Sequence, residues 1–300
     1  MTGSTGFIGS ALVSWFAKQN YEITRLVRSA SFHDHRYPAV RWDPLKRQCD
    51  PTALENHDVV VHLAGENVAQ GRWTEAKKQG IKDSRILGTT YLCEMLANLE
   101  HRPKLLLSAS ATGYYGIRDP HEKLTEESDS GTGFLASVAR QWEGATEAAQ
   151  ASGIRVVHMR FGIVLGSQGG ALAKMLPIFK LGLGGPIGSG QQIMSWIALD
   201  EIPRIIYHII QNETLMGPVN FTAPDPVSNK AFTKQLGKAL RRPAFLSLPA
   251  FAARWMFGEM AEELLLNGAY VVPKRLRDSG YKFIYPDLES AFRTIFSHPY

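Results

Sequence analysis

The chain has 300 residues, and 44% of them are hydrophobic, which is enough apolar material for one large α/β unit or two closely packed domains. No apolar run is long enough to cross a bilayer, and no signal peptide is visible. The formal net charge of +5 arises from 33 basic residues scattered among 28 acidic ones, without a basic arm or a nucleic-acid-binding motif. We therefore expect neither nucleic acid nor a membrane as a partner.

The cysteine content indicates the compartment. Cys49 and Cys93 lie far apart, and no neighbouring residues give them the spacing of metal ligands. Such usage is typical of a reducing, cytoplasmic setting, and it predicts no metal site.

The first nine residues, MTGSTGFIG, place glycines at positions 3, 6 and 9 directly before an amphipathic segment, 7–19. A glycine-rich turn that opens a helix lets a pyrophosphate approach the backbone, and the free N–H groups at the start of the helix bind the anion. This pattern predicts a dinucleotide-binding turn. The contacts that we expect from it are Gly3, Thr5, Gly6, Phe7, Ile8 and Gly9.

Only Met1 and Thr2 precede this turn. A dinucleotide-binding fold reaches the turn from a central parallel strand, which reads as a continuous apolar run. We therefore expect a truncated first strand.

Short apolar runs at 22–28, 58–64, 104–110 and 154–162 alternate with helical stretches at 75–99 and 134–151. The alternation predicts the α/β class, with a doubly wound parallel sheet of the Rossmann type. Ligands bind such sheets at the carboxyl ends of the strands. The strand-end residues expected to contact the cofactor are Arg28, Ser29, Leu63, Ala64, Gly65, Glu66 and Ser108.

The residue at the end of the second strand selects the cofactor. Enzymes that use NAD have an acidic residue there, about twenty residues after the glycines, to bind the ribose 2′-hydroxyl. This chain has Arg28, followed by Ser29. Because a guanidinium pairs with a 2′-phosphate, NADP(H) is favoured over NAD(H). The alternative is a solvated arginine at a strand end.

The sequence changes character after Gly162. Eight glycines lie between 166 and 190, around an apolar helical piece at 171–180. We expect further helices at 200–211, 229–241, 249–268 and 287–296, and a strand at 218–222. This organisation predicts a nucleotide-binding domain over 1–165 and about 195–222, and a smaller, mostly helical substrate domain over about 166–194 and 223–300.

The glycine-rich stretch from Gly182 to Gly190 offers unhindered backbone N–H groups, which suit a substrate diphosphate. We expect Gly185 and Gly188 to contact the substrate, and a mobile connector is the alternative. Arg72 and Trp73 follow the same strand-end loop as Glu66, and we expect them to contact the substrate as well.

Several motifs together resemble those of the extended short-chain dehydrogenase/reductases, and more narrowly the YfcH-type nucleoside-diphosphate-sugar epimerase family. The resemblance implies a nucleotide-sugar or similar polar substrate, a substrate contact near Trp196, and homodimerisation through the helices near 75–99 and 134–151. The motifs that carry it are the glycine turn, Leu63-Ala-Gly-Glu66, Arg72-Trp73, Ser108 to Gly116, Leu181 to Gly190 and Pro273-Lys-Arg275.

The same resemblance predicts a catalytic serine at Ser110, but the helical Tyr-x-x-x-Lys pair that extended members use for proton transfer does not follow it. One formal match, Tyr270 to Lys274, contains Pro273 and lies in the tail, and we interpret it as a coincidence. If Glu143 marks the register of the helix, the tyrosine and lysine positions fall near Leu135 and Ala139. Tyr114 or Tyr115, just past Ser110, could replace the missing acid, and an aromatic lid over the nicotinamide is the alternative.

These observations predict an NADP(H)-dependent oxidoreductase or epimerase that acts on a nucleotide sugar or a similar polar small molecule. The missing pair favours a second hypothesis, in which the protein senses NADPH with little or no catalytic activity.

Overall fold

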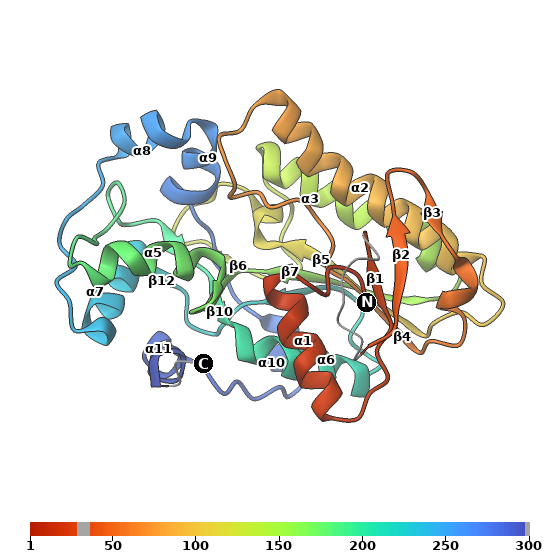
Figure 1. Ribbon diagram of the computed structural model, residues 1–300. Coiled ribbons are helices and arrows are strands. Elements are labelled where there is room, and N and C mark those ends of the chain that lie inside the picture. The colour runs from red at the N-terminus through yellow and green to blue at the C-terminus, as the bar shows by residue number, and fades with distance from the viewer. Residues whose placement is uncertain (29–36, 298–300) are drawn as a thin grey trace.

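A computed structural model of the chain describes residues 1–28 and 37–297. Its centre is a mostly parallel β-sheet covered by helices, which confirms the predicted fold class (Figure 1). Four parallel strands run in the order β11–β7–β5–β4. Their bounds are Val59–His62 for β4, Leu105–Ala111 for β5, Arg155–Phe161 for β7 and Gly217–Phe221 for β11.

The first two residues join these strands to a second group. Thr2 forms parallel bridges with His62 on β4 and with Leu26 on β1, so Met1 and Thr2 hold the central position of the sheet. They lead directly into the glycine turn. The second group consists of β1 (Arg25–Val27), β2 (Ala39–Asp43), which is parallel to β1, and β3 (Gln48–Cys49), which is antiparallel to β2.

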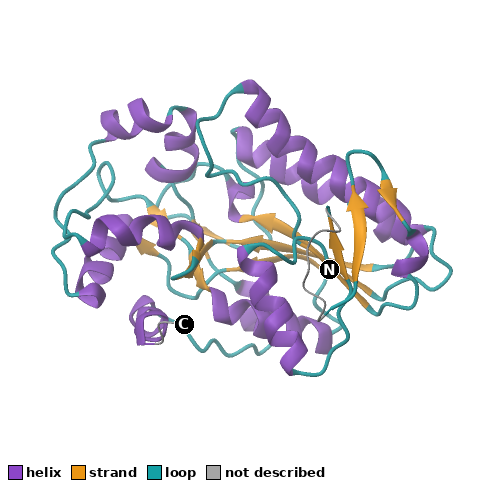
Figure 2. Ribbon diagram, viewed as in Figure 1, coloured by secondary structure: helices purple, strands orange, loops and turns teal. Residues whose placement is uncertain are grey.

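Helices cover both faces of the sheet, as Figure 2 shows. Leu105 and Leu107 of β5 pack in the core formed with α1 and α6, whereas Leu106 packs in the core formed with α2 and α4. This alternation explains why the strand reads as a continuous apolar run, since neither face of β5 meets water. The helices are α1 (Phe7–Lys18), α2 (Glu75–Ala97), α4 (Glu147–Ala151) and α6 (Ile202–Gln211).

A separate core lies beside the sheet, around the fully buried Trp196, Phe232 and Phe292. The predicted division into two domains remains a prediction. The elements that build or adjoin this core are β8 (Ile163–Gly166), α5 (Gly170–Lys180), β9 (Ile193–Met194), β10 (Trp196–Ala198), β12 (Val227–Ser228), α7 (Asn229–Leu240) and α11 (Leu288–Ser297). Three further elements connect it to the sheet, namely β6 (Lys123–Leu124), β13 (Tyr270–Val271) and α10 (Lys274–Asp278).

Two of the predicted helices are interrupted. The stretch 134–151 divides into α3 (Phe134–Gly144) and α4, and between them the Thr146 hydroxyl donates to the backbone carbonyl of Glu143. The stretch 249–268 divides into α8 (Ala250–Phe257), α9 (Glu259–Ala261) and a π-helical turn at Glu262–Leu266. Gly258, between α8 and α9, has a φ of +60°, which a right-handed helix does not accept.

Among the helices within 1–28 and 37–297, none has the length and apolarity that a membrane span requires.

Candidate functional site

The glycine turn has the close approach that the sequence predicts. Gly3 has a φ of +64°, and its carbonyl accepts a hydrogen bond from the Gly6 N–H at 3.0 Å. A Cβ on Gly9 would lie 2.1 Å from the Gly3 carbonyl oxygen, so the start of α1 packs directly on the turn. Gly6 caps α1 without a side-chain hydrogen bond, which leaves the first N–H groups of the helix free of a side-chain acceptor.

The remaining residues of the turn have different surroundings. Thr5 is exposed, the ring of Phe7 packs over the glycines at 166, 169 and 170, and Ile8 packs on the sheet core. The side chains of Phe7 and Ile8 therefore position α1, and a ligand in the turn would meet their backbone.

Thr2 ties the turn to the loop that follows β4. Its hydroxyl accepts from the N–H groups of Leu63 and Ala64, at 3.1 and 3.2 Å, and lies 2.7 Å from Nδ1 of His62. Because both lone pairs of the hydroxyl are used, its proton goes to Nδ1. Nε2 of His62 then carries the ring proton and donates to Thr89 at 3.0 Å. The predicted cofactor segments at 3–9 and 63–66 are thus joined through the Thr2 hydroxyl, which the buried neutral His62 orients.

Glu66 belongs to this loop, but its carboxylate is already paired. It accepts from Lys77 Nζ at 2.5 Å, and its backbone N–H donates to Ser84. The guanidinium of Arg85 donates to the Glu66 carbonyl. It also lies in van der Waals contact with the position that a Cβ on Gly65 would occupy. These contacts hold the loop in place from α2.

The turn and its surroundings fit a dinucleotide. The glycines keep side chains out of the turn, since a Cβ on Gly3 or Gly9 would collide with backbone atoms, and the buried hydroxyls of Ser4 and Ser108 have no hydrogen-bond partner within the described part of the chain. Unpartnered buried hydroxyls call for a ligand or a water molecule. Arg28 is exposed at the end of β1, at the edge where a 2′-phosphate would lie, and Ser29 falls outside the described residues.

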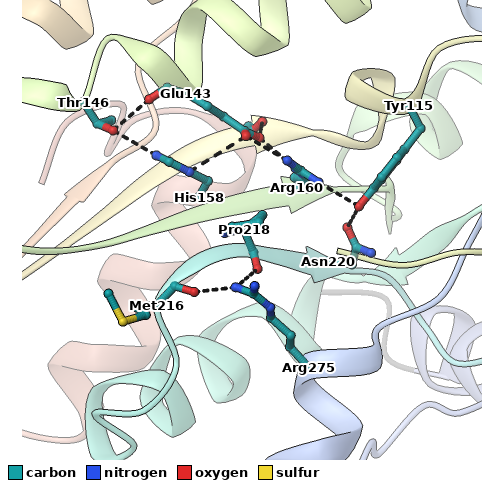
Figure 3. Close-up of polar contacts among 10 residues, drawn as sticks. Tyr115, Glu143, Thr146, His158, Arg160, Met216, Pro218, Asn220 and Arg275 are labelled. Atoms are coloured by element: carbon teal, nitrogen blue, oxygen red, sulfur yellow. Dashed lines mark hydrogen bonds and ion pairs between the residues drawn. The ribbon is translucent and has the colours of Figure 1, made fainter. Parts of the chain in front are cut away.

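A buried ion pair lies beside Ser110, near the carboxyl ends of β5 and β7 (Figure 3). Arg160 binds both carboxylate oxygens of Glu143, at 2.8 and 2.9 Å, and the two side chains are 3% and 11% exposed. Burial is the largest single influence on Arg160 and opposes its charge, but the hydrogen bonds and charge of Glu143, together with the contact to Tyr115, outweigh burial and hold the pKa of Arg160 above its usual value. The Ser110 hydroxyl donates to the same carboxylate at 2.7 Å.

The two tyrosines after Ser110 differ. Tyr115 is fully buried, and its hydroxyl accepts from Arg160 at 2.9 Å and donates to Asn220 at 2.8 Å. Burial raises the pKa of Tyr115 to about 12. Tyr114 is half-buried and lies with its ring 3.5 Å from the Arg160 guanidinium carbon. The prediction that Tyr115 could exchange a proton with a ligand is therefore corrected, since its hydroxyl is enclosed and fully bonded, and Tyr114 alone remains a candidate.

The positions where a Tyr-x-x-x-Lys pair would lie are apolar. Leu135 packs on Gly113, and Ala139 is buried on the face of α3 that also presents Glu143. Glu143 and Arg160 were not predicted as site residues. The sequence does carry a signal for them, because a glutamate on an apolar helix face and an arginine in an apolar strand both need a buried partner.

The predicted substrate residues lie in separate places. Trp73 donates to the Val68 carbonyl at 2.8 Å and packs edge-on against Phe134. Arg72 is exposed, and its guanidinium lies near Gly258, between α8 and α9. Trp196 is fully buried, and its indole donates to the Asp225 carbonyl at 3.0 Å. The structure thus corrects the prediction for Trp196, which packs in the core and presents no surface to a substrate.

The stretch 182–190 is also different from the prediction. It pairs with residues 246–248, and the Gly188 N–H donates to the Leu248 carbonyl at 2.8 Å. Gly185 is packed against the backbone of Leu246, where a Cβ would lie 2.3 Å away. The glycines therefore allow two backbone segments to approach each other, and the N–H of Gly188 is not available to a diphosphate.

Across 1–28 and 37–297, no group of three or more His, Cys, Asp or Glu side chains is placed to hold a metal ion.

The neutral state of His62 predicts a pH dependence of stability. Burial lowers the pKa of His62 to about 3, whereas a histidine in the unfolded chain titrates near 6.5. Below about pH 6.5 the unfolded chain binds a proton that the folded chain does not, so the free energy of unfolding falls by up to about 1.4 kcal/mol per pH unit. We expect His62→Asn to remove this contribution. Urea unfolding at pH 7 and pH 5 measures it, and an unchanged pH dependence in the variant would contradict the assignment.

The ion pair predicts a large difference between two arginine substitutions. Arg160→Met leaves the Glu143 carboxylate buried without its partner, and we expect it to lower the free energy of unfolding by about 3–5 kcal/mol. Arg293→Met is the matched control, because Arg293 and Glu289 form an exposed pair at 3.9 Å and such pairs contribute at most about 1 kcal/mol. Urea denaturation followed by circular dichroism measures both, and equal losses would show that the buried pair has no special role.

The chain is similar to known proteins over almost its whole length. The model of the NAD dependent epimerase/dehydratase family matches residues 1–220, and a domain of unknown function (DUF1731) matches residues 248–295. An epimerase family protein of Mycobacterium bovis is 43% identical over 284 residues, which cover 94% of this chain and 92% of the relative. A chloroplastic SDR39U1 homologue of Arabidopsis thaliana is 39% identical over 300 residues, which cover 98% of this chain and 85% of the relative.

Solved structures agree with these matches. The human epimerase family protein SDR39U1 (isoform 2), whose crystal structure was determined with NADPH, is 32% identical to this chain. The two superpose with a TM-score of 0.90, and the match covers 99% of this chain and 98% of the human one. The family model covers residues 1–220, which is more than half of the chain, and the Mycobacterium bovis relative is 43% identical over 94% of it. The chain therefore belongs to the NAD dependent epimerase/dehydratase family.

Proposed function

We propose that the protein binds NADP(H) in the turn from Gly3 to Gly9. The observation that carries the proposal is the close packing of Gly9 on Gly3, which leaves a turn without side chains beneath the free N–H groups at the start of α1. Arg28 would pair with the 2′-phosphate, and Ser4 and Ser108 would supply hydroxyls. Support comes from the human relative determined with NADPH, whereas more distant neighbours of the same fold were determined with NAD.

The proposed reaction is oxidoreduction or epimerisation of a nucleotide sugar or a similar polar small molecule. When bound, the cofactor supplies a nicotinamide that can accept or donate a hydride. Ser110 gives its proton to Glu143, so its oxygen presents lone pairs to a ligand and accepts a hydrogen bond. The group that it recognises is therefore a donor such as a sugar hydroxyl. Tyr114, beside it, would exchange the proton of that hydroxyl.

A second function, NADPH sensing with little or no turnover, is favoured by one specific observation. The helix face where a Tyr-x-x-x-Lys pair would lie carries Leu135 and Ala139, and the enclosed Tyr115 cannot replace that pair. Homodimerisation through α2 and α3 and a cytoplasmic location remain predictions from the sequence.

Cofactor selection is tested by titrating the protein with NADPH and with NADH under identical conditions. We expect tighter binding of NADPH, and we expect Arg28→Asp to abolish the preference because a carboxylate repels the 2′-phosphate. Fluorescence of the reduced nicotinamide and calorimetry measure both affinities. Arg41→Asp, on the neighbouring strand β2, is the matched control for the change in net charge. Equal affinity for the two nucleotides in the wild type would contradict the proposal for Arg28.

Catalysis is tested by screening nucleotide sugars with NADP⁺ and NADPH, and then comparing three variants on any substrate that turns over. We expect Ser110→Ala and Tyr114→Phe each to lower kcat about 10²-fold or more, in line with the loss of a positioned proton-transfer group. Tyr207→Phe is the control, because Tyr207 is exposed on α6 and makes none of the contacts described for Arg160. Tight NADPH binding without turnover on the whole panel would instead support the sensor.

A further inference from the structure

Charge is unevenly distributed along the chain, although its basic residues are interspersed with acidic ones overall. Residues 166–199 and 226–258 contain no aspartate or glutamate and together contain eight lysines and arginines. The formal net charge of the whole chain is only +5, so the rest of the chain is net acidic. The two segments therefore form a basic part of the molecule, although Glu262 and Glu289 from neighbouring segments pair with two of these cations, Arg254 and Lys238.

The fold brings these two segments together. They form α5, the stretch 181–190, α7 and α8, which lie at the end of the molecule opposite β1–β3 in Figure 1. Residues 180–186 run beside 242–248, where Arg242 donates to the Lys180 carbonyl at 2.9 Å and the Leu246 N–H donates to the Gly184 carbonyl at 3.2 Å. The acid-free segments thus share one side of the structure.

Large apolar side chains protrude from the same segments. Trp255 is 80% exposed, Leu181 and Phe251 are 74% exposed, and Phe245 is 72% exposed. Phe251 and Trp255 lie four residues apart on α8, so they occupy one face of that helix. Isolated exposed apolar residues are common, but a group of them on adjacent segments marks an interaction site. We call these four residues, with Lys180, the basic–apolar surface.

We propose that the basic–apolar surface docks onto an anionic lipid membrane. Tryptophan and phenylalanine partition into the headgroup region, and nearby lysine and arginine side chains are attracted by anionic lipids. Charge complementarity favours this partner over a second copy, because a two-fold interface would place basic residues against basic residues. Leu181 has no π-face on which a nucleic-acid base could stack, so a lipid surface fits better than a nucleic acid.

This proposal departs from the sequence-based expectation of no membrane partner, and it does not depend on the proposed cofactor chemistry. That expectation rested on the scattered charge of the chain and on the lack of an apolar run long enough to span a bilayer. Surface docking requires neither a long apolar run nor a high overall charge, but only apolar and basic side chains that the fold brings to one side.

The test is co-sedimentation of the full chain with vesicles of phosphatidylcholine alone and of phosphatidylcholine mixed with phosphatidylglycerol. We expect binding to the mixed vesicles only, with weaker binding as salt increases. The double variant Phe251→Ala/Trp255→Ala should lose roughly tenfold or more in affinity because both rings leave the interface. Lys180→Glu should lose roughly fivefold or more.

Matched controls lie outside the two acid-free segments. Leu87→Ala on α2, where the leucine is 50% exposed, and Lys104→Glu, whose lysine side chain is 85% exposed, should leave vesicle binding unchanged. Thermal unfolding verifies that each variant is folded. Equal binding to neutral vesicles, full binding by the double variant, or binding to an oligonucleotide or self-association in place of vesicle binding would each overturn the proposal.

Discussion

A buried guanidinium requires an acceptor for its N–H groups, and Arg160 organises the end of the sheet through this requirement. Its bonds reach Glu143 on α3 and Tyr115 after β5, and Tyr115 in turn binds Asn220 on β11. The ring of Tyr114 covers its face. One side chain on β7 therefore fixes the relative positions of three elements, and the orientation of Ser110 follows because it shares the carboxylate of Glu143.

The parts of the fold that depend on local patterns could be predicted from the sequence. The glycine turn is contained within nine residues, and strands such as β5 begin with a run of leucines because both faces of the sheet are covered. The short strands β2 and β9 were not predicted, although β4 and β11, which are also short, were. Helix interruptions were missed as well, since Gly258 becomes a break only through its positive φ.

The candidate site was harder to predict, because its contacts join residues that are distant along the chain. Nothing local to Glu143 indicates that Arg160 will lie opposite it, and the hydrogen bonds of Tyr115 depend on Asn220, far later in the sequence. The stretch 182–190 shows the same limit. Its glycines indicate a close backbone approach, but the approaching group is the backbone near Leu246 and Leu248, which lies in another segment of the chain.

The positions of a tyrosine–lysine pair are taken by Leu135 and Ala139, and the buried ionic pair nearby is instead Glu143 with Arg160. Tyrosine with a nearby lysine can release and regain a proton near neutral pH, whereas arginine keeps its proton at any physiological pH. The bonds to Glu143 raise the pKa of Arg160 further, so this pair positions its neighbours and transfers nothing. A proton could leave a ligand only through Tyr114 or solvent. The reaction that we propose therefore depends on Ser110 and Tyr114, and not on the ion pair.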